Sequence, residues 1–176
     1  MAANINSNYY IMTSYGGWSP CIQGNNAYGL RPFAGSVLPN CVGYAVGRWN
    51  ELMNLGACTY LGNRDAKWLY SLAISQGCTA SSTPTTGALM VWGDLTDPND
   101  DGHAAIVETV NSPTQVVASE SGWNYTSAPI IRNITRNSGG GSWGSSKPFL
   151  GFVDIPVPIP TPGGSSKYYM LFLDEE

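Results

Sequence analysis

Cys41 lies where a cysteine could act as a nucleophile. It follows the Pro39–Asn40 turn and opens a segment, Val42–Met53, whose apolar residues recur with helical spacing. Asn is a preferred N-cap residue, so the sequence predicts that this helix begins at about Cys41. Backbone N–H groups at a helix start lack partners within the helix and stabilise a thiolate there. Cys41 is therefore a candidate nucleophile, and a buried structural cysteine is the alternative.

A nucleophilic thiolate needs a partner that accepts and returns protons, and histidine is the side chain best suited to this. The chain contains one histidine, His103, at the start of the predicted strand "HAAIVETV". The turn "VNSPTQ" joins it to a second predicted strand, "QVVASE", which ends at Glu120. In an antiparallel hairpin these two ends meet, so Glu120 is the candidate that orients the imidazole by accepting its other N–H.

The order of the predicted elements indicates an α+β fold with N-terminal helices packed on an antiparallel sheet. The first helix is expected to end near Gly56, and a second covers Asp65–Ser75, with Asn63 as start signal and Gly77 as stop signal. Five β-rich segments follow, separated by turn residues: 88–92, 103–110, 115–120, 128–135 and 149–155.

The two ends of the chain have a different composition. Residues 1–37 are rich in Gly, Asn, Ser and Tyr and are expected to form an ordered loop with one short helix at most. Residues 156–168 read as a linker, stiff where prolines alternate and flexible at Gly-Gly-Ser-Ser. Residues 169–176 are too few to fold alone and are interpreted as a tail or the start of a missing cell-wall-binding domain.

Charge and composition limit the classes of partner. The 176-residue chain has a net charge of −4, which argues against nucleic acid or an anionic membrane as partner. No apolar run approaches the roughly 18 residues of a membrane span, and no signal peptide is evident. Cys21, Cys58 and Cys78 are expected to be buried free thiols, with one disulfide among them as the alternative.

Four motifs together resemble those of the CHAP family of cysteine, histidine-dependent amidohydrolases and peptidases. They are "NCVGYAVGRW", "GALMVWG", "GHAAIVETV" and "SESGWN", in the order of that family, within a resemblance from about Trp18 to Ile155. The resemblance implies a papain-like catalytic domain over residues 1–155, with Cys41 as nucleophile, His103 as general base and Glu120 orienting the histidine. Many members have an Asn two residues after this Glu; because Gly122 stands there, Asn124 is the candidate fourth catalytic residue.

The resemblance also implies a substrate, bacterial peptidoglycan, and bacterial cell lysis by an N-acetylmuramoyl-L-alanine amidase or a stem or cross-bridge endopeptidase. A phage endolysin catalytic domain fits best. It would be made in the host cytoplasm and act on the cell wall after release, with wall affinity supplied by a separate domain or subunit. A papain-like peptidase acting on proteins and a catalytically inactive wall-binding relative are the alternatives.

Further residues are assigned provisional roles. Asn40 is a candidate oxyanion donor, although N-capping explains it equally well. Trp123 and Trp143 lie among Gly and Ser residues and are candidates for substrate contact. Three other tryptophans lie on apolar faces and are expected in the core: Trp49, Trp68 and Trp92.

The segment "DPNDDGHAAIVE" matches the pattern of a calcium-binding EF-hand loop. The predicted strand from His103 would carry Glu108 far from Asp97, so a true EF-hand is not expected. A looser calcium site built from Asp97, Asn99 and Asp101 and a solvated acidic turn are the two remaining interpretations. The thiol mechanism itself requires no cofactor.

Overall fold

The computed structural model describes residues 24–26, 29–31, 40–53, 61–62, 64–121 and 131–154. Its helices are α1 (Cys41–Met53) and α2 (Ala66–Ser75), and a short 3₁₀ turn covers Gly139–Gly141. The strands are β1 (Gly24–Asn26), β2 (Gly29–Arg31), β3 (Thr79–Ser81), β4 (Leu89–Trp92), β5 (His103–Ser112), β6 (Gln115–Ser121), β7 (Ile131–Asn137) and β8 (Phe149–Asp154).

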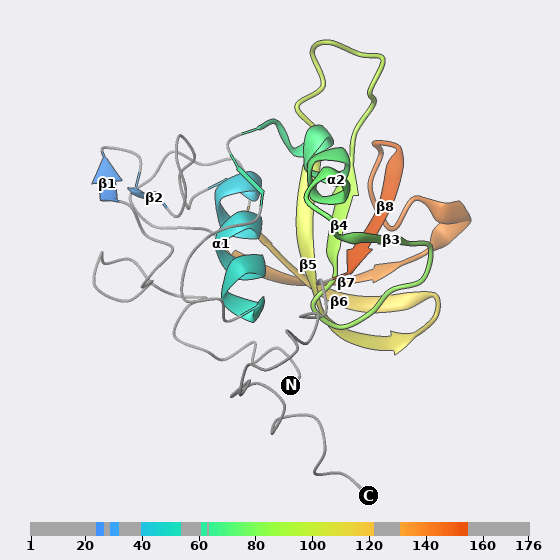
Figure 1. Cartoon of the computed structure of the whole chain (residues 1–176). Coiled ribbons are helices and arrows are strands. Elements are labelled where there is room, and N and C mark those ends of the chain that lie inside the picture. The colour runs from blue at the N-terminus through green and yellow to red at the C-terminus, as the bar shows by residue number, and fades with distance from the viewer. Residues whose placement is uncertain are drawn as a thin grey trace, which may run out of the picture.

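Six of the strands form one antiparallel sheet in the order β3-β8-β4-β5-β6-β7, while β1 and β2 pair only with each other. Helix α1 packs against β5 and β6, and α2 packs against β3, β4, β5 and β8. Both helices therefore lie on the same side of the sheet (Figure 1). This arrangement confirms the predicted α+β class with helices packed on an antiparallel sheet.

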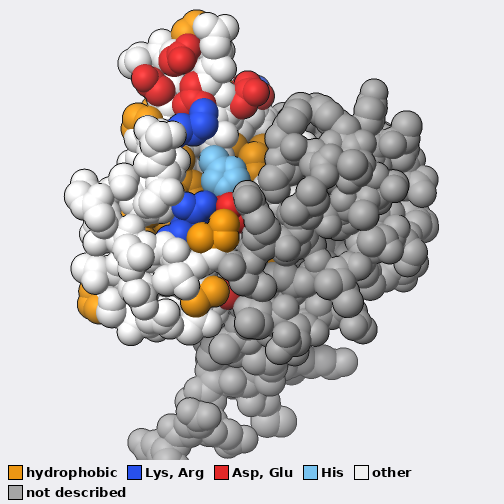
Figure 2. Space-filling view, turned by 180° about the vertical axis from the view of Figure 1, so that it is seen from behind, with side chains coloured by type: hydrophobic (Ala, Val, Ile, Leu, Met, Phe, Trp, Pro, Cys, Tyr) orange, Lys and Arg blue, Asp and Glu red, His pale blue; other side chains and the backbone are white. Residues whose placement is uncertain are grey.

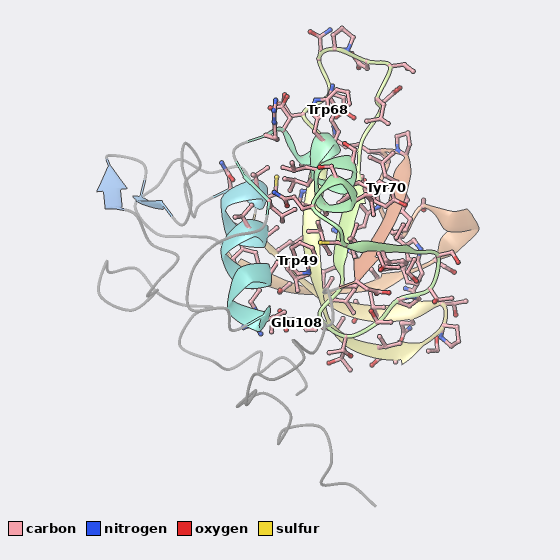
Figure 3. All side chains as sticks on the ribbon, in the orientation of Figure 1. Trp49, Trp68, Tyr70 and Glu108 are labelled. Carbon is pink, nitrogen blue, oxygen red and sulfur yellow. The ribbon has the colours of Figure 1, made fainter. Side chains whose placement is uncertain are left out.

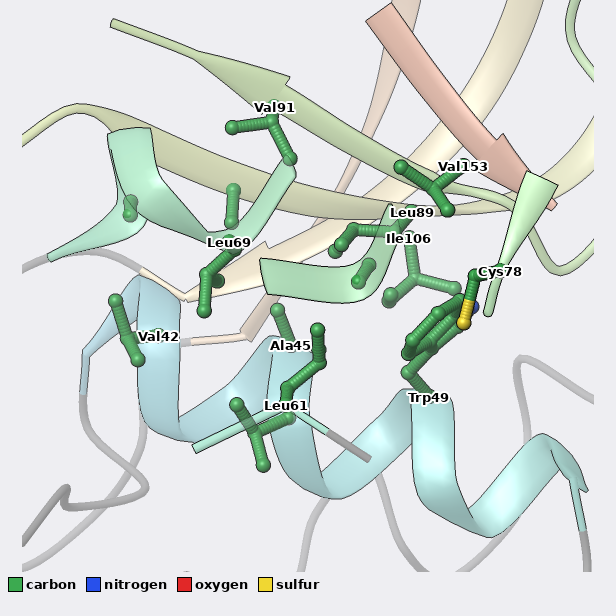
Figure 4. Packing of buried hydrophobic residues seen from close by; sticks show 14 residues of the cluster. Val42, Ala45, Trp49, Leu61, Leu69, Cys78, Leu89, Val91, Ile106 and Val153 are labelled. Carbon is green, nitrogen blue, oxygen red and sulfur yellow. The ribbon is translucent and has the colours of Figure 1, made fainter. Parts of the chain in front are cut away.

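Alternating residues of the strands build two apolar clusters. Leu89 and Val91 of β4 pack with both helices, whereas Met90 and Trp92 belong to a second cluster. Because successive side chains of a strand point to opposite faces, β4 is buried on both sides. In the first cluster, the apolar stripe of α1 faces the strands (Figure 4). This double burial explains why "ALMVW" is continuously apolar.

The predicted elements agree closely with the observed ones. Helix α1 begins at Cys41 as expected, and the second helix matches α2, although Asp65 rather than Asn63 precedes it. The five predicted strands correspond to β4 to β8. The three-residue edge strand β3 was not predicted, and neither were β1 and β2. The predicted stop at Gly56, the linker 156–168 and the tail 169–176 lie outside the described residues.

The tryptophans expected in the core divide into two groups. Trp49 and Trp92 are fully buried, as predicted, but the prediction for Trp68 was wrong: its side chain is 41% exposed on α2 (Figure 3). The buried residues of α2 include Ala66, Leu69 and Ala73, and Trp68 does not share their helical face. Within the described ranges, neither helix has the length and apolarity needed to span a membrane.

A buried ion pair joins α1 to the sheet. Arg48 Nε and Nη2 donate to the two carboxylate oxygens of Glu108 at 3.1 and 3.0 Å, and the side chains are only 2% and 0% exposed. Ser119 Oγ donates to Glu108 Oε1 at 2.5 Å. Burial raises the pKa of Glu108 to about 7, although the hydrogen bond from Ser119 acts in the opposite direction. The last residue of the calcium-loop pattern is thus a structural residue of β5.

We expect Glu108→Leu to lower the free energy of unfolding by about 3–5 kcal/mol, because it removes the carboxylate that faces the buried Arg48. The double variant Arg48→Met/Glu108→Leu removes both charges and should recover most of this loss. Urea denaturation followed by circular dichroism measures both. A single variant within 1 kcal/mol of wild type would contradict this account of the pair.

Candidate active site

The first turn of α1 presents Cys41. Asn40 caps the helix, since its Oδ1 accepts the N–H of Gly43 at 2.7 Å and its carbonyl accepts that of Tyr44 at 3.1 Å. Cys41 is a free thiol, partly buried, at the first helical residue. This confirms Asn40 as the N-cap. Capping uses only the oxygen atoms of Asn40, so the predicted oxyanion role of its amide nitrogen stays a prediction.

His103 is the first residue of β5 and is paired with Trp92 at the end of β4. The two rings lie 5.6 Å apart between centroids, and 21% of the histidine side chain is exposed. Its Nε2 lies 2.8 Å from Glu120 Oε2, and Cys41 lies close enough to the imidazole to raise its pKa. Figure 2 shows the histidine (pale blue), the only one in the chain, reaching the surface beside Lys and Arg side chains (blue).

The pairing of β5 with β6 brings Glu120 to His103. Ile106 is opposite Ser119, so continuing the register by one residue places Glu120 opposite Ala105 and diagonal to His103. The Glu120 side chain is buried, and its Oε2 also accepts a hydrogen bond from Arg136 Nη2. The hairpin expected from the sequence thus brings His103 and Glu120 together, and α1 supplies Cys41.

The charges of this group shift two pKa values in opposite directions. Burial lowers the pKa of His103, but hydrogen bonds to Cys41 and Glu120 and their negative charges outweigh it and raise the pKa from 6.5 to about 9. Burial raises the pKa of Glu120, yet hydrogen bonds and positive charge from His103 and Arg136 lower it to about 2. At neutral pH the pair is therefore an imidazolium and a carboxylate.

These shifts also make the fold sensitive to pH. The folded-state pKa of His103 lies above its unfolded value, so its contribution to stability is complete below pH 6.5 and is lost as the pH rises through about 9. For Glu120 the folded-state pKa is depressed, so its contribution is present above pH 4.5 and is lost as the pH falls through about 2.

Two glycines let α2 approach the strand ends beside His103. A Cβ on Gly93 would lie 2.4 Å from Lys67 Cβ, and one on Gly102 would lie 2.4 Å from Lys67 N and 2.6 Å from the Trp92 carbonyl. Gly102 also has a φ of +78°, which disfavours a side chain. The glycine before His103 is thus required both for its backbone conformation and for the start of α2.

Other predicted site residues are placed differently. Trp143 is only 5% exposed and packs in the second apolar cluster against Phe149 and Phe152, so its ring is buried, and its contact with substrate stays a prediction. A Gly/Ser-rich surrounding suggested exposure, but the aromatic residues of β8 cover the ring. Trp123 and Asn124 lie outside the described residues. Cys78 is a buried free thiol, as expected, and Cys21 and Cys58 also lie outside the described residues.

The loop between β4 and β5 gives the predicted calcium site no support. Asp97, Asn99 and Asp101 are exposed, and Asp97 Oδ1 accepts the N–H of Asn99 at 2.8 Å. Among the described residues, no three His, Cys, Asp or Glu side chains converge to hold a metal ion. The positive charge at this loop comes from lysines: Lys67 Nζ donates to the Asp97 carbonyl at 2.7 Å, and Lys147 Nζ donates to Asp100.

The sequence analysis did not single out Arg136 or Asp100. Arg136 lies in the polar strand segment "IRNITRN". The pairing of β7 with β6 places it opposite Val116, four residues from Glu120, and its long side chain spans the remaining distance to the carboxylate. Asp100 is buried and accepts the N–H groups of Asp94 at 2.6 Å and Gly102 at 2.9 Å. A buried Asp within a run of exposed acidic residues has no sequence signature of its own.

Comparison with known proteins identifies the family. The model of the CHAP domain matches residues 32–122, more than half of the chain, so the chain belongs to the CHAP family. The matched residues include Cys41, His103 and Glu120. This is the family that the four sequence motifs indicated. A search of curated proteins found no match.

Among solved structures, the chain is similar to an N-acetylmuramoyl-L-alanine amidase from Staphylococcus aureus. The sequence identity is 24% and the TM-score 0.47, over 67% of this chain and 31% of the amidase chain. The chain thus corresponds to about a third of that structure.

The single histidine makes the predicted protonation state directly measurable. We expect the imidazole ¹⁵N signals to show a doubly protonated ring at pH 7.5, with loss of the proton at about pH 9. In Cys41→Ala the midpoint should fall, because the interaction with Cys41 that raises the pKa of His103 is lost. A wild-type midpoint at or below 6.5 would contradict the ion pair.

Gly102→Ala should lower the free energy of unfolding by roughly 3 kcal/mol or more, because it combines left-handed strain with overlap with α2. Gly77→Ala is the matched control. Its φ is +89° but nothing lies within 4 Å of the added Cβ, so the expected cost is about 1–2 kcal/mol. If urea denaturation shows the same loss of stability in Gly102→Ala and Gly77→Ala, the close approach of α2 does not require a glycine at position 102.

Proposed function

We propose that this chain is a peptidoglycan hydrolase that cleaves an amide bond by a Cys-His-Glu thiol mechanism. One observation carries the proposal: Cys41, at a helix start, lies close enough to His103 to raise the pKa of the imidazole, and Nε2 of His103 is 2.8 Å from Glu120 Oε2. This is the chain of contacts that a thiolate–imidazolium pair with an orienting carboxylate needs. Membership of the CHAP family supports peptidoglycan as substrate.

In the proposed mechanism the Cys41 thiolate attacks the amide carbonyl carbon. Backbone N–H groups at the start of α1 stabilise the oxyanion, with the Asn40 amide as a further donor. His103, held as an imidazolium, protonates the leaving amine and then, as a neutral base, activates the water that hydrolyses the acyl-enzyme. Glu120 occupies Nε2 of His103, which leaves Nδ1 as the ring nitrogen that can exchange a proton with the thiol.

The proposal leaves two positions for the amide bond that is cut. The same three residues serve an amidase, which cuts between the muramoyl lactyl group and L-alanine, and an endopeptidase, which cuts within stems or cross-bridges. We further propose that the protein acts in bacterial lysis, as phage endolysins do. The net charge of −4 favours an arrangement in which a separate module supplies wall affinity.

We expect the wild-type chain to release fragments from purified Gram-positive sacculi and Cys41→Ala to release none while remaining folded, because the nucleophile is lost. Mass spectrometry of the fragments identifies the cut: free lactyl ends with intact stem peptides indicate an amidase, and cut stems or bridges indicate an endopeptidase. Cys78→Ala is the matched control, since this thiol is buried in the first apolar cluster.

Three outcomes would contradict the proposal. Release of the same fragments by folded Cys41→Ala would exclude the thiol mechanism. Cleavage of casein without any release from sacculi would favour a protein peptidase, and binding to sacculi without cleavage of either would favour an inactive relative.

A further inference from the structure

Arg136 of β7 is a buried cation in direct contact with the proposed catalytic group. Its side chain is 8% exposed, and Nη2 donates to Glu120 Oε2, the same oxygen that lies 2.8 Å from His103 Nε2. The other terminal nitrogen, Nη1, donates to the carbonyl of Trp143 at 3.0 Å and reaches that of Gly144 at 3.4 Å. One guanidinium therefore joins the carboxylate to the turn that precedes β8.

The turn that receives Arg136 is held in place from the other side. Trp143 has a φ of +52°, which is unusual for a residue with a side chain, and Gly144 follows at +74°. The Trp143 ring is anchored edge-on against Phe152, with centroids 5.1 Å apart. Packing of this ring thus maintains a strained backbone whose carbonyls face the guanidinium.

Trp92 completes the enclosure of Arg136. The guanidinium carbon lies 4.6 Å from the centroid of the Trp92 ring, the same ring that lies 5.6 Å from that of His103. The indole N–H of Trp92 donates to the Ser142 carbonyl at 2.8 Å, in the same turn. Arg136 is therefore fixed by an aromatic face and by backbone carbonyls, contacts that do not involve Glu120.

We propose that Arg136 is a positioning residue of the Cys41–His103–Glu120 group, which holds the Glu120 carboxylate ionised and aimed at Nε2 of His103. Among the side chains that the structure describes, the charged groups paired with this carboxylate are His103 from β5 and Arg136 from β7, and Cys41 of α1 acts on the same imidazole. Arg132 of β7 stands opposite Glu120 in the strand register. The nearby Lys147 and Asp100 are paired with each other.

The need for such a residue follows from the burial of Glu120. Removing a carboxylate from water favours its neutral form, and a neutral Glu120 would no longer stabilise the imidazolium. A rotatable carboxylate would also let the imidazole turn away from the thiol. A guanidinium that is itself fixed counters both effects, whereas a flexible cation counters mainly the first.

Nuclear magnetic resonance of the single histidine tests this role without requiring activity on peptidoglycan. In the wild type, the Nε2 proton signal should stay constant between pH 7 and pH 4, because the pKa of Glu120 is about 2. The titration is then extended to pH 2. In Arg136→Met, which keeps the length of the side chain but not its charge, the signal should show a step whose midpoint lies at least one pH unit above that of the wild type. Arg64→Met removes an exposed arginine and is the matched control.

Lysis of sacculi provides the second measurement and depends on the proposed function. Arg136→Met should lower the rate about 10- to 100-fold, because the imidazole is less well oriented. Arg136→Lys keeps the charge but loses the planar fork, so it should leave the midpoint of the Glu120 step near the wild-type value yet lower the rate. Arg64→Met should match the wild type in both measurements.

The proposal is overturned if folded Arg136→Met shows wild-type histidine signals throughout the titration. If Arg136→Met does not fold, Arg136→Lys provides the test. Histidine signals and lysis by Arg136→Lys that both equal the wild type would overturn the proposal. Reduced lysis by folded Arg136→Lys would support it. Absence of lysis by the wild type together with the expected histidine step would count against the proposed function and leave the role of Arg136 supported.

Discussion

The buried ion pair between Arg48 of α1 and Glu108 of β5 determines how the first helix lies on the sheet. Arg48 is two helical turns beyond Cys41, and Glu108 is five residues along the strand from His103. These separations correspond to about 10 Å along the helix and about 17 Å along the strand. The contact between Arg48 and Glu108 fixes α1 relative to β5. It therefore also limits how the Cys41 thiol and the His103 imidazole can be placed at the start of both elements.

The proposed active site depends on a balance between buried positive and negative charges. Glu120 is removed from water, which on its own would make the carboxylate neutral. Its contacts with His103 and Arg136 reverse that tendency, and the same carboxylate then helps to keep His103 protonated at neutral pH. The catalytic pair proposed here is thus a product of several buried charges that are stable only together, because each would be costly to bury alone.

The tryptophans show where local patterns misled. Trp143 lies in a Gly- and Ser-rich segment typical of an exposed turn, yet β8 folds back and covers its ring. Trp68 lies in an apolar-looking helix, yet its position falls outside the buried stripe of α2. In both cases exposure depends on which distant element packs against the residue, and the local sequence carries no record of that partner.

Local chemistry in the sequence was sufficient for the cap at Asn40, the helix start at Cys41 and the hairpin that carries His103 and Glu120. These features depend on neighbours a few residues away, so propensity and turn signals predict them. Only the tertiary structure decided that Arg136 contacts Glu120, that Arg48 contacts Glu108 and that lysines hold the acidic loop. Those contacts join residues from about 16 to 60 positions apart, and the order of the strands, not local composition, brings them together.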